Sequence, residues 1–75
     1  MNKEEKRYRK EITKFGQKLR EAREEKSLSQ LDLELNSGIN RTEISRIENG
    51  QKNIEFFTIV KLAEALQIEL SHFFL

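Results

Sequence analysis

The sequence predicts an all-α fold, a small bundle of five helices. Apolar residues recur every three or four positions in residues 1–26 and again in residues 56–66, the spacing of one face of an α-helix. Two shorter segments between them end at Gly38 and Gly50, and glycine readily adopts the left-handed conformation that ends helices. Proline is absent, and no segment has a partner strand with which to form a sheet.

Length and composition narrow the class of protein. A chain of 75 residues makes one small domain, near the lower limit for a core that folds unaided. Because there is no cysteine, disulfides and thiolate metal sites are excluded. The first residues are charged, and no apolar run approaches the roughly 18 residues of a membrane span. We therefore expect no signal peptide, no membrane segment and a cytoplasmic location.

Charge is distributed unevenly along the chain, although the formal net charge is only +1. Residues 1–26 hold ten Lys and Arg against six Glu, a net charge of +4. Residues 27–75 hold four against seven acidic residues, a net charge of −3. This asymmetry fits a protein that presents a basic edge to a polyanion. On charge alone, a solvated charged helix explains it equally well.

We predict a single amphipathic helix over residues 2–26. Residues 1–11 form a basic N-terminal extension, and residues 12–75 form the folded domain. The extension has little but Tyr8 to bury, so it is either one or two added helical turns or a frayed, solvated arm. The apolar stripe that defines the helix consists of Tyr8, Ile12, Phe15, Leu19 and Ala22.

Ser29 is predicted to cap a second helix, which begins at the next residue. Residues 31–35 alternate strictly between leucine and acidic residues, which is a strand signal. We nevertheless predict a helix, because the segment is short, capped and enclosed by helices. Leu33 then faces the core, while Leu31 and Leu35 share a more exposed face.

A third helix follows a tight turn, and the pair spans residues 30–50. Gly38 ends the second helix, and Asn40 caps the third, with Glu43 three residues later completing a capping box. Ile44 and Ile47 fall on one face, whereas the first turn is polar and basic. A short, sharply bounded helix of this kind is typical of a helix that enters a DNA groove.

The fourth helix is predicted to start at Asn53 or Glu55. We expect its apolar stripe to supply half of the core: Phe56, Ile59, Val60, Leu62, Ala63 and Leu66.

The C-terminal residues are unusually apolar for so small a domain. Ser71 is predicted to cap a last helical turn over residues 72–75. One small core does not need so many large apolar side chains, so we expect some of them to meet a second subunit. The predicted dimer interface consists of Phe57, Phe73, Phe74 and Leu75.

Residues 15–74 resemble the lambda-repressor-like helix-turn-helix domains, the family of the phage repressors and Cro proteins. The resemblance covers about sixty of the 75 residues and implies the compact five-helix fold of that family, here with an extended first helix. Glu34 departs from the pattern, since the family usually has a small residue there. The matching residues are Phe15-Gly16, Leu19-Arg20, Arg23, Leu28-Ser29-Gln30, Leu33, Ser37-Gly38-Ile39, Ile44 to Gly50, Leu62-Ala63, Ala65-Leu66 and Leu70.

The resemblance also implies roles for individual residues. Arg prefers the guanine edge, Asn the adenine edge and Thr the thymine methyl group or a phosphate. An ion pair between Arg23 and Glu48 is expected to align the third helix, which is the recognition helix that enters the DNA groove. Base contacts are expected from Asn40, Arg41, Thr42, Ser45 and Arg46, and phosphate contacts from Gln30, Lys52, Asn53 and Arg20.

These observations predict a sequence-specific DNA-binding regulator of transcription, a repressor or autoregulator that binds a palindromic operator on double-stranded DNA as a homodimer. The alternative is a protein-interaction module of the same fold, such as an antitoxin, with weak or no DNA binding. Controller proteins, phage or plasmid repressors and antitoxins all fit this size. We expect no catalytic residue, metal, cofactor or small-molecule ligand, because the only histidine is His72 and no metal-ligand cluster is evident.

Overall fold

The structure is a computed structural model that describes all 75 residues. It contains no strand, and its fifth element is a short 3-10 helix instead of an α-helix. The all-α prediction is therefore confirmed, with four α-helices and one 3-10 turn. The elements are α1 (Lys3–Glu25), α2 (Gln30–Ser37), α3 (Arg41–Glu48), α4 (Phe56–Leu66) and η1 (Leu70–Phe74).

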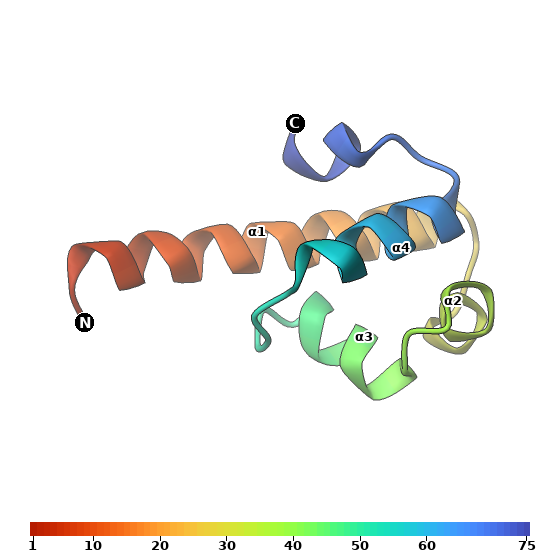
Figure 1. Cartoon of the computed structure of the whole chain (residues 1–75), viewed down its shortest axis with the longest axis horizontal. Helices are drawn as coiled ribbons and strands as arrows, with labels where there is room; N and C mark the ends of the chain where they lie inside the picture. The colour runs from red at the N-terminus through yellow and green to blue at the C-terminus, as the bar shows by residue number, and fades with distance from the viewer.

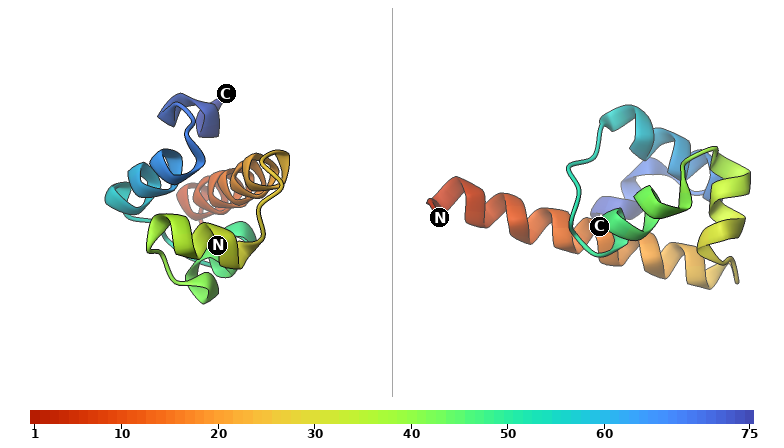
Figure 2. Two further views of the ribbon diagram at one scale, coloured as in Figure 1. Left: turned by 90° about the vertical axis from the view of Figure 1, so that its right-hand side faces the viewer. Right: turned by 90° about the horizontal axis from the view of Figure 1, so that it is seen from below.

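The long helix α1 organises the molecule (Figure 1). It runs along the longest dimension of a body that measures 38 × 24 × 20 Å. Helix α3 and the 3-10 helix η1 both pack against α1, while α2 packs against α3 and α4. The views in Figure 2 show that the first turns of α1 project beyond all the other elements.

The core lies where the C-terminal half of α1 meets α2, α3 and α4. Leu19, Leu33, Ile44, Ile47 and Leu62 are completely buried there. They come from four different helices, so a single cluster joins the whole domain.

Helix α4 contributes less to this core than its sequence predicts. Phe56 and Val60 are 66% and 37% exposed, so the assignment of these two residues to the core is wrong. The stripe that reaches the core includes Ile59 and Leu62. Val60 lies one residue past Ile59, about 100° round the helix, and Phe56 is the first residue of α4.

The ends of α2 and α3 follow the predicted capping residues, with one exception. Gly38 and Gly50 have positive φ angles of 77° and 68°, as expected for residues that end helices. The capping box, however, forms at α2: the Asp32 amide donates to Ser29 Oγ at 3.0 Å, and the Ser29 amide donates to Asp32 Oδ2 at 2.9 Å. At α3 the Asn40 side chain accepts from the second residue of the helix, the Thr42 amide, at 2.7 Å. The box predicted there is therefore absent.

The N-terminal extension is helical. Asn2 caps α1 by accepting a hydrogen bond from the Glu5 amide at 2.8 Å, and the helix then continues without a break into the folded domain. Residues 1–11 are all exposed, including Tyr8. Of the two forms that the sequence left open, the structure therefore has the added helical turns.

The C-terminal turn corrects part of the predicted dimer interface. Phe73 is only 2% exposed and packs on Phe15, with 5.0 Å between the ring centroids. Its ring belongs to the core of its own chain, because η1 folds back onto α1, and it is not available to a partner. Ser71 lies inside η1 instead of capping it, and Glu69 occupies the cap position without a side-chain hydrogen bond.

Candidate nucleic-acid interface

Helix α3 has one buried and one exposed face. Ile44 and Ile47 are completely buried on the inner face. Arg41 and Arg46 are exposed, and neither side chain makes a hydrogen bond or an ion pair within the chain. Both guanidinium groups are therefore free to bind a partner. The structure brings all five residues predicted to contact bases to α3 or its cap, and all but the half-buried Ser45 are exposed: Asn40, Arg41, Thr42, Ser45 and Arg46.

The four residues predicted to contact phosphates fall into two groups. Lys52 and Asn53 lie in the loop between α3 and α4 and make no hydrogen bond through their side chains. Arg20 and Gln30 instead point to the end of α3: Arg20 Nη2 donates to Asn49 Oδ1 at 3.0 Å, and Gln30 Nε2 donates to Glu48 Oε1 at 3.0 Å. The Gln30 amide group still has a second N–H free for a ligand.

Glu48 anchors the C-terminal end of α3. Its buried carboxylate accepts hydrogen bonds from Arg23 Nε at 2.7 Å and from Arg23 Nη2 at 3.0 Å, a bidentate ion pair. Arg20 Nε lies 3.4 Å from the same carboxylate. With Gln30, three side chains from α1 and α2 thus converge on one carboxylate of α3, and no buried side-chain polar atom of the chain is left without a partner. The sequence predicted the Arg23 pair, whereas the roles of Arg20 and Gln30 in this cluster were missed.

This cluster changes the acidity of Glu48. Burial on its own raises the pKa of the carboxyl group, but the hydrogen bonds from Arg23 and Gln30 and the positive charge of Arg23 outweigh it, so the pKa lies below the ordinary value of a glutamate. Glu48 is therefore ionised at neutral pH. The anchor of α3 is a charged group that is fully paired.

Helices α1 and α3 approach each other with backbone contact. A Cβ atom added to Gly16 would lie 2.3 Å from the Ile47 carbonyl oxygen and 2.8 Å from that of Glu48. A Cβ atom on Gly50 would meet Thr13 Oγ1 at 2.9 Å. The absence of a side chain at Gly16 therefore lets α3 lie directly against α1. This backbone contact and the hydrogen bonds of the Glu48 cluster together fix the position of α3.

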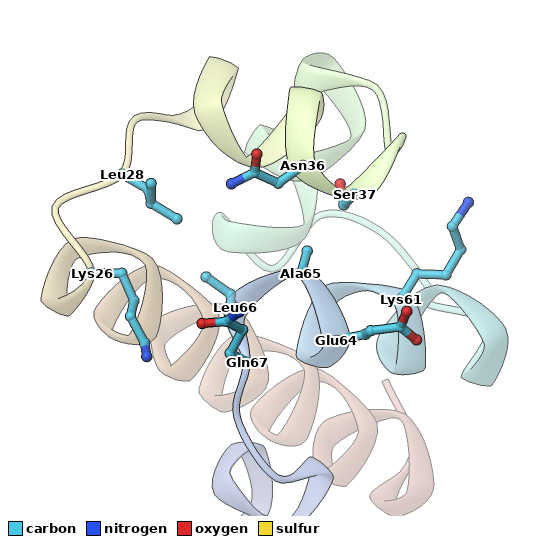
Figure 3. Close-up of a pocket in the computed structure, with 9 residues that line it drawn as sticks. All are labelled: Lys26, Leu28, Asn36, Ser37, Lys61, Glu64, Ala65, Leu66 and Gln67. Carbon is cyan, nitrogen blue, oxygen red and sulfur yellow. The ribbon is translucent and has the colours of Figure 1, made fainter.

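One hollow of the molecule lies away from this face (Figure 3). It is an open pocket of about 610 Å³, and no residue of α3 lines it. No group of three or more histidine, cysteine, aspartate or glutamate side chains is placed to hold a metal ion. No helix combines the length and apolar character needed to span a membrane. The pocket is lined by Lys26, Leu28, Asn36, Ser37, Lys61, Glu64, Ala65, Leu66 and Gln67.

Two short helices joined by a glycine turn, the second buried on one face and bearing free arginines on the other, define a helix-turn-helix domain. The comparisons with known proteins agree. The profile of the helix-turn-helix family matches residues 19–73, and the chain belongs to this family, in its Cro/C1 type.

Regulatory proteins are among its relatives. The HTH-type transcriptional repressor RghR of Bacillus subtilis (strain 168) is 49% identical over 55 residues, which make up 72% of this chain and 41% of RghR. The chain thus spans about two fifths of the length of RghR. The control protein C.MunI of Mycoplasma sp is 39% identical over 62 residues, 81% of this chain and 84% of C.MunI. These names give no support to the alternative of an antitoxin.

Solved structures of restriction-modification controller proteins show the same fold. C.AhdI from Aeromonas hydrophila superposes with a TM-score of 0.81 at 45% identity, covering 83% of this chain and 94% of C.AhdI. The C.Esp1396I tetramer in complex with its natural 35 base-pair operator superposes with a TM-score of 0.79 at 28% identity, covering 85% and 84% of the two chains.

Proposed function

We propose that the protein is a sequence-specific DNA-binding regulator of transcription, a repressor or autoregulator that acts on double-stranded DNA in the cytoplasm. The observation that carries the proposal is the exposed face of α3, on which Arg41 and Arg46 are unpaired while the opposite face is held rigidly against α1. Arginine is the side chain that most often reads guanine in the major groove, through two parallel hydrogen bonds. The named repressor and controller proteins among the relatives support the same function.

We further propose that the chain acts as a homodimer. A single short recognition helix reads only a few base pairs, too few to specify one site in a genome. After the correction at Phe73, the remaining candidates for the interface are strongly exposed: Phe57 is 70%, Phe74 57% and Leu75 83% exposed. The Lys61 ammonium group lies over the Phe57 ring, with Nζ 5.5 Å from the ring centroid. Three such exposed apolar side chains on a chain of 75 residues are candidates for a surface that a partner covers.

Selection of bound sequences from random double-stranded DNA tests the function directly. We expect a consensus with two-fold symmetry, whose half-sites are separated by about one helical turn, 34 Å, or a multiple of it. Failure to enrich any sequence would contradict the proposal. An asymmetric single half-site would contradict the homodimer and leave DNA binding intact.

Removing the free arginines of α3 should weaken specific binding. We expect Arg41→Ala and Arg46→Ala each to cost about 1–3 kcal/mol on the consensus and to relax preference at one base pair. The matched control is Lys18→Ala on α1, which removes the same charge outside α3 and should leave the consensus unchanged. Titration of each variant against the consensus and against single-base variants measures both effects. An unchanged consensus in both arginine variants would show that α3 does not read bases.

Polar replacements of Phe57 and Phe74 should weaken the dimer. We expect Phe57→Ser and Phe74→Ser each to raise the dimer dissociation constant about tenfold, because each removes a large buried apolar area from the interface. Sedimentation across a dilution series measures the dissociation constant. The control is the double variant Leu31→Ser/Leu35→Ser, since both leucines are also exposed but lie on α2. Dissociation of the control and not of the Phe variants would place the interface on α2.

A further inference from the structure

The helical extension at the start of α1 lies outside the family match, which begins at residue 19. We propose that this part of α1, residues 3–11, is a second DNA-contacting element, in which Lys6 and Arg9 bind phosphates that border the groove beyond the C-terminal end of α3. This inference rests on the proposed function and extends the contact surface beyond the helix-turn-helix motif.

The direction of the two side chains follows from the helical repeat. Seven residues make almost two turns, so residues seven apart lie on the same face. Arg9 therefore shares a face with Gly16, and Lys6 shares one with Thr13. Gly16 and Thr13 are the residues of α1 that abut the last residues of α3 and Gly50. The side of α1 that rests on α3 thus continues, uncovered, into the extension (Figure 2, right).

The position of residues 3–11 along α1 also agrees with the proposed DNA contact. From its C-terminal to its N-terminal half, α1 contacts α3 through Arg20 and then through Gly16, and next reaches Gly50 through Thr13. Residues 3–11 therefore extend past the C-terminal end of α3, on the side where the loop with Lys52 begins. The extension adds about 13 Å of helix in this direction.

The distance between the axes of α1 and α3 is suited to contact with the phosphates that border the major groove. The major groove is about 8.5 Å deep, and closely packed helices lie about 8 Å apart, axis to axis. When α3 lies at the floor of the groove, the phosphates that border the groove lie at a depth between those of α3 and α1. Long basic side chains on the face of α1 that is turned toward α3 can reach these phosphates.

The charges of the extension favour DNA over a second protein chain. Lys6 and Arg9 are exposed and unpaired, because both ion pairs of the chain involve Glu48. The only aromatic residue of the extension, Tyr8, is half exposed and has no apolar neighbour within residues 3–11 that could build an interface. Residues 3–11 hold five Lys and Arg against three Glu, a net charge of +2. A helical surface with this net charge and without an apolar stripe is suited to a polyanion.

The salt dependence of binding to the selected consensus tests the proposal. For the double variant Lys6→Gln/Arg9→Gln, we expect the slope of log K against log salt to fall by about two per chain, since each phosphate contact contributes about 0.9. The control is Arg7→Gln/Lys14→Gln, which removes the same charge. Arg7 lies two positions before Arg9, and Lys14 two before Gly16, so each is turned about 160° round α1 from that residue and about 100° from Lys6 or Thr13. Glutamine keeps the helix propensity in both variants.

Three results would overturn the proposal. An equal fall in both double variants would mean that only the overall charge matters, and no fall in either would mean that the extension does not contact DNA. Dissociation of the Lys6→Gln/Arg9→Gln protein into monomers without DNA, seen by sedimentation, would show that the extension contacts a second copy of the chain. Phosphate contacts are indifferent to sequence, so the same comparison on random-sequence DNA tests the extension separately from sequence-specific regulation.

Discussion

Replacing Glu48 by alanine is expected to destabilise the protein by about 3–5 kcal/mol, because it leaves the buried guanidinium of Arg23 without its counter-charge. The loss also frees Arg20 and Gln30, which donate to the same carboxylate. Urea unfolding at neutral pH, followed by circular dichroism, measures the free energy of unfolding. Glu43→Ala is the matched control: it removes the same charge from the same helix, but Glu43 makes no hydrogen bond or ion pair, so we expect a change within about 0.5 kcal/mol. Similar losses in the two variants would show that the hydrogen bonds around Glu48 add no stability beyond the effect of removing a negative charge from α3.

The same prediction has a pH-dependent part. The pKa of Glu48 is lowered in the folded protein, so the stability that its pairing contributes is fully present above the ordinary carboxyl pKa of about 4.5. That stability is lost as the pH falls through the lowered, folded-state pKa. The difference in unfolding free energy between the wild type and Glu48→Ala should therefore shrink in acid. Some acid sensitivity remains in the variant, because the hydrogen bonds from Ser29 also lower the pKa of Asp32.

Gly16→Ala is expected to destabilise the protein by about 2 kcal/mol, although alanine normally improves a helix interior by about 1 kcal/mol over glycine. The added methyl group would lie 2.3 Å from the Ile47 carbonyl oxygen, a backbone atom that has no rotamer to change. Helix α3 must therefore move away from α1, and overpacking of this kind costs about 1–3 kcal/mol. Thermal and urea unfolding measure the loss.

An exposed neighbour provides the control for this substitution. Gln17→Ala changes the next residue of the same helix and should alter stability by no more than about 0.5 kcal/mol. Because α3 is displaced in the Gly16→Ala protein, we expect its affinity for the consensus to fall even at temperatures where it is fully folded. A variant as stable as the wild type, with unchanged affinity, would show that the contact between α1 and α3 tolerates a side chain.

Local signals account for most of what the sequence predicted correctly. Ser29, Gly38 and Gly50 mark helix ends through their own backbone and side-chain chemistry, so they are visible without knowledge of the fold. The inward positions of Ile44 and Ile47 follow from helical periodicity in the same way. The exposed face of α3 was therefore predictable from local signals, whereas the contacts assigned to its residues rest on the family resemblance and stay predictions.

The errors occur where distant segments decide the outcome. A stripe on α4 shows which residues share a face but not how far the neighbouring helices extend, so Phe56 was wrongly placed inside. Val60 was wrongly placed for another reason, since it lies about 100° round the helix from Ile59. Phe73 is buried only because η1 folds back to Phe15, a contact 58 residues away in sequence. The convergence of Arg20 and Gln30 on Glu48 has the same origin, since it joins three helices. Such contacts depend on tertiary packing that no local pattern encodes.

The attachment of α3 has a consequence for how mismatched operators are accommodated. The Glu48 carboxylate is held from α1 and α2, and the backbone of α3 at Ile47 and Glu48 lies against Gly16, so we expect tilting or sliding of α3 to be costly. When half-sites are spaced less than ideally, the strain must pass to the duplex, as bending or altered twist. The energy of such deformation depends on the base steps between the half-sites. We therefore expect base pairs that no side chain touches to contribute to operator choice.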